Sequence, residues 1–186
     1  MSPVSTRCRA FALALVLPLL LTTIGAAQGQ SDKDLKAISA YTFTMPKYRQ
    51  LMKAMVNLGK AAERDPKLAA TLETSGDQSL DQMAASYQRV APARKAIADA
   101  GLTTREYAVA LGAMLQMGMS YGIMKEYKLT ADSVSKATGV SKANLEFYGT
   151  HEAELIRMSK EMEAAMPKDK RVEAEDAVED TADSTE

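Results

Sequence analysis

The sequence predicts an all-α protein, an irregular helical bundle of about five to seven helices around a central apolar helix at residues 104–126. Three observations lead to this fold class. Apolar residues recur every three to four positions in successive segments, and no window alternates with a period of two. Residues that begin and end helices stand at the boundaries of these segments. One long segment, residues 107–124, holds no charged residue.

Capping residues and a proline set the helix boundaries in the first part of the chain. Ser31 or Asp32 is expected to cap a short first helix. Thr44 caps a second, longer helix that runs to about Arg64, because Pro46 falls in its first turn, where the missing amide costs little. The apolar positions of this helix repeat as expected for one buried side: Tyr48, Leu51, Met52, Met55, Val56 and Leu58.

The next helices are short and closely spaced. Asp65, followed by a proline, caps a short helix. Ser79 and Gln82 form a capping box for the following helix, which Pro92 interrupts. The chain continues as a further helix until Gly101, which we expect to end it in the left-handed conformation.

The central helix is the most apolar element after the first 27 residues. Thr103 and Glu106 form a second capping box that starts it at residue 104. A helix that is apolar on most faces belongs in the middle of a bundle or in a membrane. In a bundle, we expect three glycines to be notches for neighbouring helices, and a leucine at the second of them to overpack: Gly112, Gly118 and Gly122.

A bilayer span is the alternative for residues 107–124. Their number is near the lower limit for spanning, and Gly118 and Gly122 have the spacing that lets membrane helices approach closely. However, Ala, Gly, Gln, Ser and Tyr dilute the hydrophobicity, and the flanking charges show no asymmetry. We therefore expect no membrane contact. An envelope protein that contacts the membrane through residues 107–124 stays a second alternative.

Two helices complete the bundle. Thr130 begins a short helix to Thr138, and Gly139 closes it. Ser141 caps the last long helix, which carries one apolar stripe: Leu145, Tyr148, Leu155, Met158 and Met162.

The first 27 residues have the pattern of a cleaved signal peptide. Arg7 and Arg9 form a positive region, residues 11–21 are apolar, and small residues lead to a cleavage site near Ala27. Cleavage also removes Cys8, the only cysteine, so the mature chain can form no disulfide, cysteine zinc site or cysteine nucleophile. This pattern predicts a periplasmic or secreted protein.

The charges divide the chain into a body and a tail. Residues 172–186 carry seven acids and no base, whereas residues 28–171 carry 21 bases and 17 acids. We expect a single helical domain at 28–171 and a disordered acidic tail at 172–186. A tail that folds over the basic body or recruits a cationic partner is the alternative. The bases are scattered and aromatic residues are few, which argues against a nucleic-acid partner.

Catalytic motifs are missing from the sequence, so we expect no enzyme and no cofactor. His151 is the only histidine, and the segment that it begins lacks the second histidine of the HExxH zinc-protease pattern. The sequence contains no Gly-x-Ser-x-Gly elbow, phosphate-binding glycine loop or dinucleotide fingerprint. Acid pairs such as Glu152 and Glu154 lie two apart on a helix and point in different directions.

A ligand-binding bundle is the main alternative to a module without ligand, with haem, Cu(I) or a small apolar molecule as the ligand. His151 follows Phe147 by four residues, so the two rings can be neighbours on a helix. A bundle can hold haem between a histidine and a methionine on different helices, and Met52 and Met55 are candidates. Packing of the histidine on the aromatic ring is the simpler interpretation.

Methionines in the central helix suggest the Cu(I) alternative. Met114, Met117 and Met119 read MLQMGM, similar to methionine clusters that bind Cu(I) through thioethers. Met114 and Met117 share one side of a helix, whereas Met119 is turned away from Met117. The sequence therefore favours methionine as an adaptable core residue over a metal site.

Three segments carry a resemblance: TFTMPKYRQ, AGLTTREYAVALGAM and NLEFYGTHEAEL. In this order after a signal peptide, they resemble an uncharacterised group of small exported bacterial all-helical proteins to which no activity is assigned. The resemblance implies a periplasmic or secreted helical domain from a Gram-negative bacterium and no catalytic residue. The expected function is a non-enzymatic binding or structural module, with a protein partner in the cell envelope.

Overall fold

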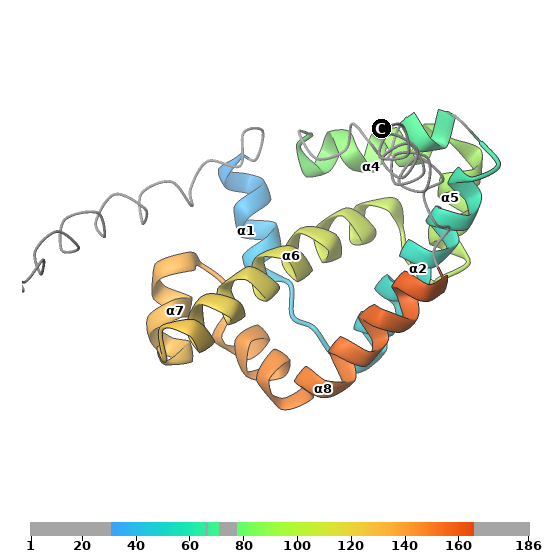
Figure 1. The fold of residues 1–186 in the computed structure, drawn as a ribbon. Coiled ribbons are helices and arrows are strands. Elements are labelled where there is room, and N and C mark those ends of the chain that lie inside the picture. The colour runs from blue at the N-terminus through green and yellow to red at the C-terminus, as the bar shows by residue number, and fades with distance from the viewer. Residues whose placement is uncertain (1–30, 66, 71–77, 166–186) are drawn as a thin grey trace, which may run out of the picture.

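A computed structural model describes residues 31–65, 67–70 and 78–165, and every regular element in these ranges is a helix (Figure 1). The prediction of an all-α bundle is confirmed. Besides a short helical turn at residues 67–70, seven helices are described: α1 (Asp32–Ala40), α2 (Met45–Ala62), α4 (Leu80–Arg89), α5 (Ala91–Ala98), α6 (Thr104–Glu126), α7 (Ala131–Thr138) and α8 (Lys142–Ala165). The predicted signal peptide at 1–27 and the acidic tail at 172–186 lie outside the described residues.

The predicted capping residues start the helices as expected. Thr103 caps α6. Its hydroxyl accepts a hydrogen bond from the backbone amide of Glu106 at 3.1 Å, and the Glu106 carboxylate accepts one from the backbone amide of Thr103 at 2.8 Å. Ser79 and Gln82 make the same reciprocal pair at the start of α4. Ser31 caps α1, again within a capping box. Each cap provides acceptors for amides that a helix start leaves free.

Helix α6 occupies the centre of the bundle, as predicted. It contacts all six of the other labelled helices, and α1 and α8 can be seen on different sides of it in Figure 1. Most of its buried side chains are small, which lets neighbouring helices approach, and two tyrosines and a methionine fill the wider spaces: Tyr107, Ala108, Ala110, Ala113, Met117, Ser120 and Tyr121. The absence of charge from residues 107–124 fits this position, because a charge in the centre of the bundle would be desolvated.

The prediction that three glycines of α6 form notches is correct at one position and wrong at two. A Cβ atom at Gly112 would lie 2.9 Å from Cδ1 of Ile38 on α1, which is closer than atoms pack. At Gly118 and Gly122 a Cβ atom would meet nothing within 4 Å. The neighbouring helices therefore leave this part of α6 uncovered, and a leucine at position 118 has room.

A buried asparagine fastens the link between α1 and α2 to α8. The side-chain amide of Asn144 donates to the Tyr41 carbonyl at 2.7 Å, and its oxygen accepts the Phe43 amide at 2.9 Å. Beside this contact, the Phe43 ring stacks on Phe147 of α8, with 6.1 Å between the ring centroids. The extended link thus finds its hydrogen bonds in a side chain, since no strand is there to supply them.

None of the described helices combines the length and the apolar character that a bilayer crossing requires. For residues 107–124 this agrees with the prediction of a helix within a bundle.

Candidate functional site

The most unusual surface of the described structure is the uncovered side of α6. Leu115 and Met119 are 56% and 63% exposed, and they lie one helical turn apart. Gly118 and Gly122, which have open space above them, follow the same side of the helix. We call Leu115, Gly118, Met119 and Gly122 the α6 face.

The α6 face differs from the usual scatter of exposed apolar residues. Single exposed apolar side chains are common on protein surfaces and need no explanation. Here two large ones adjoin each other on a segment without charge, and the two glycines lower the surface beside them. Glycines at this spacing let a second helix come close to the backbone. This arrangement can bind an apolar helix and offers no group for acid–base chemistry.

A polar cluster joins α6 to α8 near one end of the α6 face. Glu152 accepts a hydrogen bond from the Tyr121 hydroxyl at 3.1 Å and from Lys125 Nζ at 2.6 Å. The hydrogen bond from Lys125 lowers the pKa of Glu152 below its ordinary value, so the carboxylate is charged at neutral pH. Burial and the hydrogen bond to Glu152 raise the pKa of the Tyr121 hydroxyl. The cluster therefore links α6 to α8 by an ion pair and a hydrogen bond.

A second cluster joins the starts of α1, α4 and α6. The carboxylate of Asp34, 2% exposed, accepts the Leu80 amide at 3.4 Å and lies 3.7 Å from Arg105 Nη2. The other terminal nitrogen of Arg105 lies 3.1 Å from Asp81, whose pKa is lowered by Lys33 and by Arg105. This cluster holds three helices together, and sequence analysis missed it because the acid and its partners are far apart in the chain.

The structure places the candidate haem ligands on two packed helices, α2 and α8. His151 is half-buried, and its ring lies 5.0 Å from the Phe147 ring, as the four-residue spacing predicts. On α2, Met52 is 6% exposed and belongs to the apolar core, and Met55 is partly buried against it. The observed neighbour of the histidine is therefore an aromatic ring.

The candidate Cu(I) ligands do not share one environment. Met117 is fully buried, Met119 is 63% exposed, and Met114 is partly buried against the core. The structure thus does not bring Met119 to the buried sulfur of Met117, in line with their positions on opposite sides of the helix.

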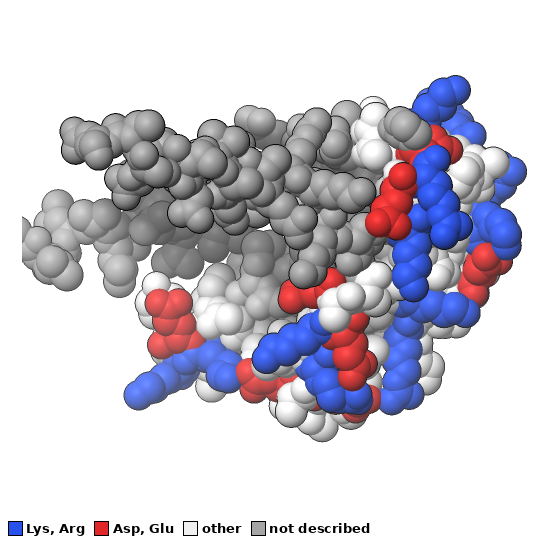
Figure 2. All heavy atoms as spheres, turned by 45° about the vertical axis from the view of Figure 1, so that its right-hand side comes forward, with Lys and Arg blue, Asp and Glu red and all other residues white. Residues whose placement is uncertain are grey.

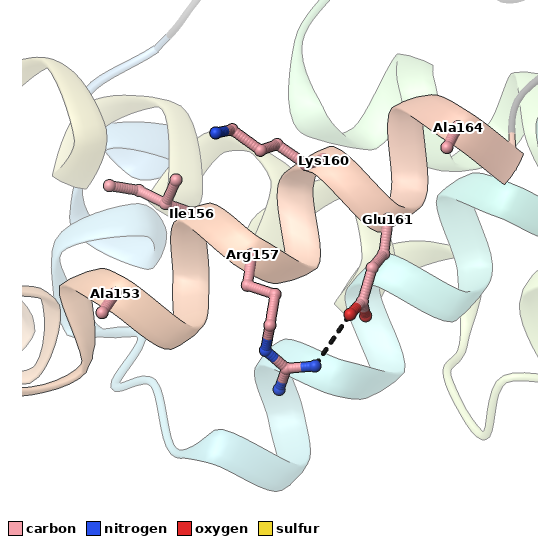
Figure 3. A pocket seen from close by; sticks show the side chains of 6 residues that line it. All are labelled: Ala153, Ile156, Arg157, Lys160, Glu161 and Ala164. Carbon is pink, nitrogen blue, oxygen red and sulfur yellow. Dashed lines mark hydrogen bonds and ion pairs between the residues drawn. The ribbon is translucent and has the colours of Figure 1, made fainter.

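None of these histidine or methionine candidates lines either of two hollows on the surface of the described residues. Figure 3 shows one of them on the outside of α8, where the Arg157 guanidinium lies 2.7 Å from the Glu161 carboxylate. All its lining residues belong to this single helix: Ala153, Ile156, Arg157, Lys160, Glu161 and Ala164. The other is lined by residue 78 and the outer side of α4. A hollow formed by one helix can contact a ligand from one side only, whereas ligand-binding sites are concave and enclose most of the ligand.

Metal-binding geometry is also missing from the described part of the chain. Within residues 31–65, 67–70 and 78–165, no three side chains of the types His, Cys, Asp or Glu come together closely enough to hold a metal ion.

Comparison of the chain with family models, with curated proteins and with solved structures found no match.

Proposed function

We propose that this protein is a non-enzymatic binding module that is exported by its leader and holds an apolar helix of a protein partner in the cell envelope against the α6 face. The observation that carries the proposal is the exposure of Leu115 and Met119 beside the two open glycines. The leader pattern at residues 1–27 supports the export step.

The chemistry of the α6 face selects the kind of partner. An apolar helix can place side chains between Leu115 and Met119 and bring its backbone over Gly118. A charged or strongly polar partner would lose hydration here without gaining a hydrogen bond or an ion pair, because residues 107–124 carry no charge. The ion pair of Lys125 with Glu152 joins this part of α6 to α8.

The binding step is tested by photocrosslinking in the producing cells. A photoreactive benzoylphenylalanine replaces Met119, and in a control chain it replaces Lys136, an exposed residue of α7. We expect one discrete covalent adduct from position 119 and none from position 136. Leu115→Lys in the same chain should remove the adduct, because a charge would then stand in the apolar face.

Two results would contradict the binding proposal. One is the same set of adducts from positions 119 and 136, which would show unspecific contact. The other is an adduct with twice the mass of the chain, which would show that the α6 face binds a second copy. Gly118→Leu serves as a further variant: it has room in the fold, yet it fills the space that the partner helix needs, so it should also reduce the adduct.

The export step is tested separately. The N-terminal sequence of the chain isolated from the cell envelope should begin near Gln28. A chain that keeps residues 1–27 would overturn the export step and leave the α6 face untouched.

A further inference from the structure

Helix α2 carries a row of basic side chains on its outer surface. Arg49, Lys53 and Lys60 are exposed and spaced by four and seven residues, and Arg64 continues the row in the turn after the helix. These spacings place the four residues on one side of a helix. We call them the α2 basic stripe. In Figure 2 many blue side chains, with red ones among them, lie over the right-hand part of the surface that faces the viewer.

Acidic partners are scarce along the α2 basic stripe. Within the described residues only Arg49 has an ion pair, with Glu154 of α8 at 2.8 Å. Residues 45–62 contain no acid, and Glu63 follows them as the C-cap of α2. Like charges in a row along a helix repel one another. An anionic segment that binds to such a row therefore gains more electrostatic free energy than it would on a surface of mixed charge.

The chain itself supplies such a segment. Residues 172–186 carry seven acids and no base. Helix α8, from whose end at Ala165 the chain continues toward this segment, packs against α2, and the two helices run in a similar direction in Figure 1. We propose that residues 172–186 bind to the α2 basic stripe of the same molecule. This contact is independent of the α6 face, which lies on another helix.

The length of the connection allows this contact. Glu173, the first acid of residues 172–186, stands eight positions after Ala165, and an extended chain of eight residues spans up to about 27 Å. The 18 residues of α2 are also about 27 Å long, so the acidic segment can reach the whole stripe. A tethered segment also has a local concentration in the millimolar range, so weak ion pairs suffice to hold it.

Zero-length carbodiimide crosslinking tests the contact on the chain as it is isolated. The reagent forms an amide bond between a lysine amine and a carboxylate that are in direct contact. Trypsin cuts after Arg171 and leaves residues 172–186 in one peptide, because this segment holds no Lys or Arg. The matched internal controls are Lys36 on α1 and Lys136 on α7, which are exposed and, within the described residues, have no acidic partner. Lys160 is not counted, because it is close to the tail in the sequence.

We expect to find the peptide of residues 172–186 crosslinked to Lys53 and Lys60 but not to Lys36 or Lys136. High salt should remove this product, because exposed charges are then screened. Arg64→Glu keeps both reactive lysines and should lower their yield about threefold, while Lys136→Glu, with the same change of charge, should not.

Three results would overturn the proposal. Equal yields on Lys53, Lys60 and Lys36 would show contact without preference. An unchanged yield in Arg64→Glu would show that the charge of the stripe is not involved. In a mixture of ¹⁴N and ¹⁵N chains, products of mixed isotope content would show that the acidic segment binds a second copy.

Discussion

The side-chain amide of Asn144 donates to the carbonyl oxygen of Tyr41, 103 positions earlier in the chain, at 2.7 Å. The same side chain accepts the Phe43 amide. One buried residue of α8 thus satisfies two backbone polar groups of the link that leads into α2, the Tyr41 carbonyl and the Phe43 amide. Because the link leads directly into α2, its attachment to α8 also positions the start of α2 in the bundle, and with it the α2 basic stripe.

Removal of this side chain should therefore be costly. Asn144→Ala leaves the Phe43 amide and the Tyr41 carbonyl without these partners, and we expect a loss of about 2–4 kcal/mol in the free energy of unfolding, measured in urea. Asn57→Ala is the matched control, because it removes one partly buried hydrogen bond, to the Ala96 carbonyl, and should cost about 1 kcal/mol. Equal losses in both variants would show that the double hydrogen bond has no special weight.

Leucine substitutions at two glycines of α6 should have different effects. Gly112→Leu must displace Ile38 and should lower the free energy of unfolding by about 1–3 kcal/mol. Gly118→Leu meets open space and replaces a poor helix former, so it should be neutral or stabilise by up to about 1 kcal/mol. Thermal unfolding of both variants decides this, and a clear fall of the midpoint in Gly118→Leu would speak against an uncovered α6 face.

The ionic link through Glu152 should contribute to stability in a pH-dependent way. Because the folded-state pKa of Glu152 is below its ordinary value of 4.5, its contribution is present above that value and is lost as the pH falls through the folded-state pKa. Glu152→Gln removes the charge at every pH. We expect the parent chain to melt at a higher temperature than this variant at about pH 7 and the difference to vanish at about pH 2. A difference that stays the same over this range would argue against the link with Lys125.

The buried carboxylate of Asp34 should be needed for the junction of α1, α4 and α6. Asp34→Ala removes the acceptor of the Leu80 amide and leaves Arg105 with the exposed Asp81 alone, at a cost of about 2–4 kcal/mol. Asp32→Ala, at an exposed position of the same helix, should change stability by less than about 1 kcal/mol. Chemical denaturation of the two variants measures the difference, and similar values would mean that burial of Asp34 has no energetic consequence.

Local geometry explains what could be predicted about the site. The contact of His151 with Phe147 follows from a spacing of four residues within one helix. The separation of Met119 from Met117 follows from the same geometry. The exposure of the α6 face could not be predicted, because the spacing of Gly112, Gly118 and Gly122 gives no information about which of them a neighbouring helix covers. The packing of the neighbouring helices decides this: α1 covers Gly112, and no neighbour lies within 4 Å of a Cβ atom built at Gly118 or Gly122.

The sequence by itself determined the helices and those ends that carry a local cap, because a cap such as Thr103 with Glu106 is complete within four residues. The start of α5 at Ala91, one residue before Pro92, has no side-chain cap and was not predicted. The sequence also determined that α6 is central, because the uncharged residues 107–124 lose little hydration free energy when other helices surround them. Only the tertiary structure decided which side of α6 stays open and which acid faces Arg105. These features depend on contacts between residues far apart in the chain, such as Tyr41 with Asn144, and helical periodicity carries no information about them.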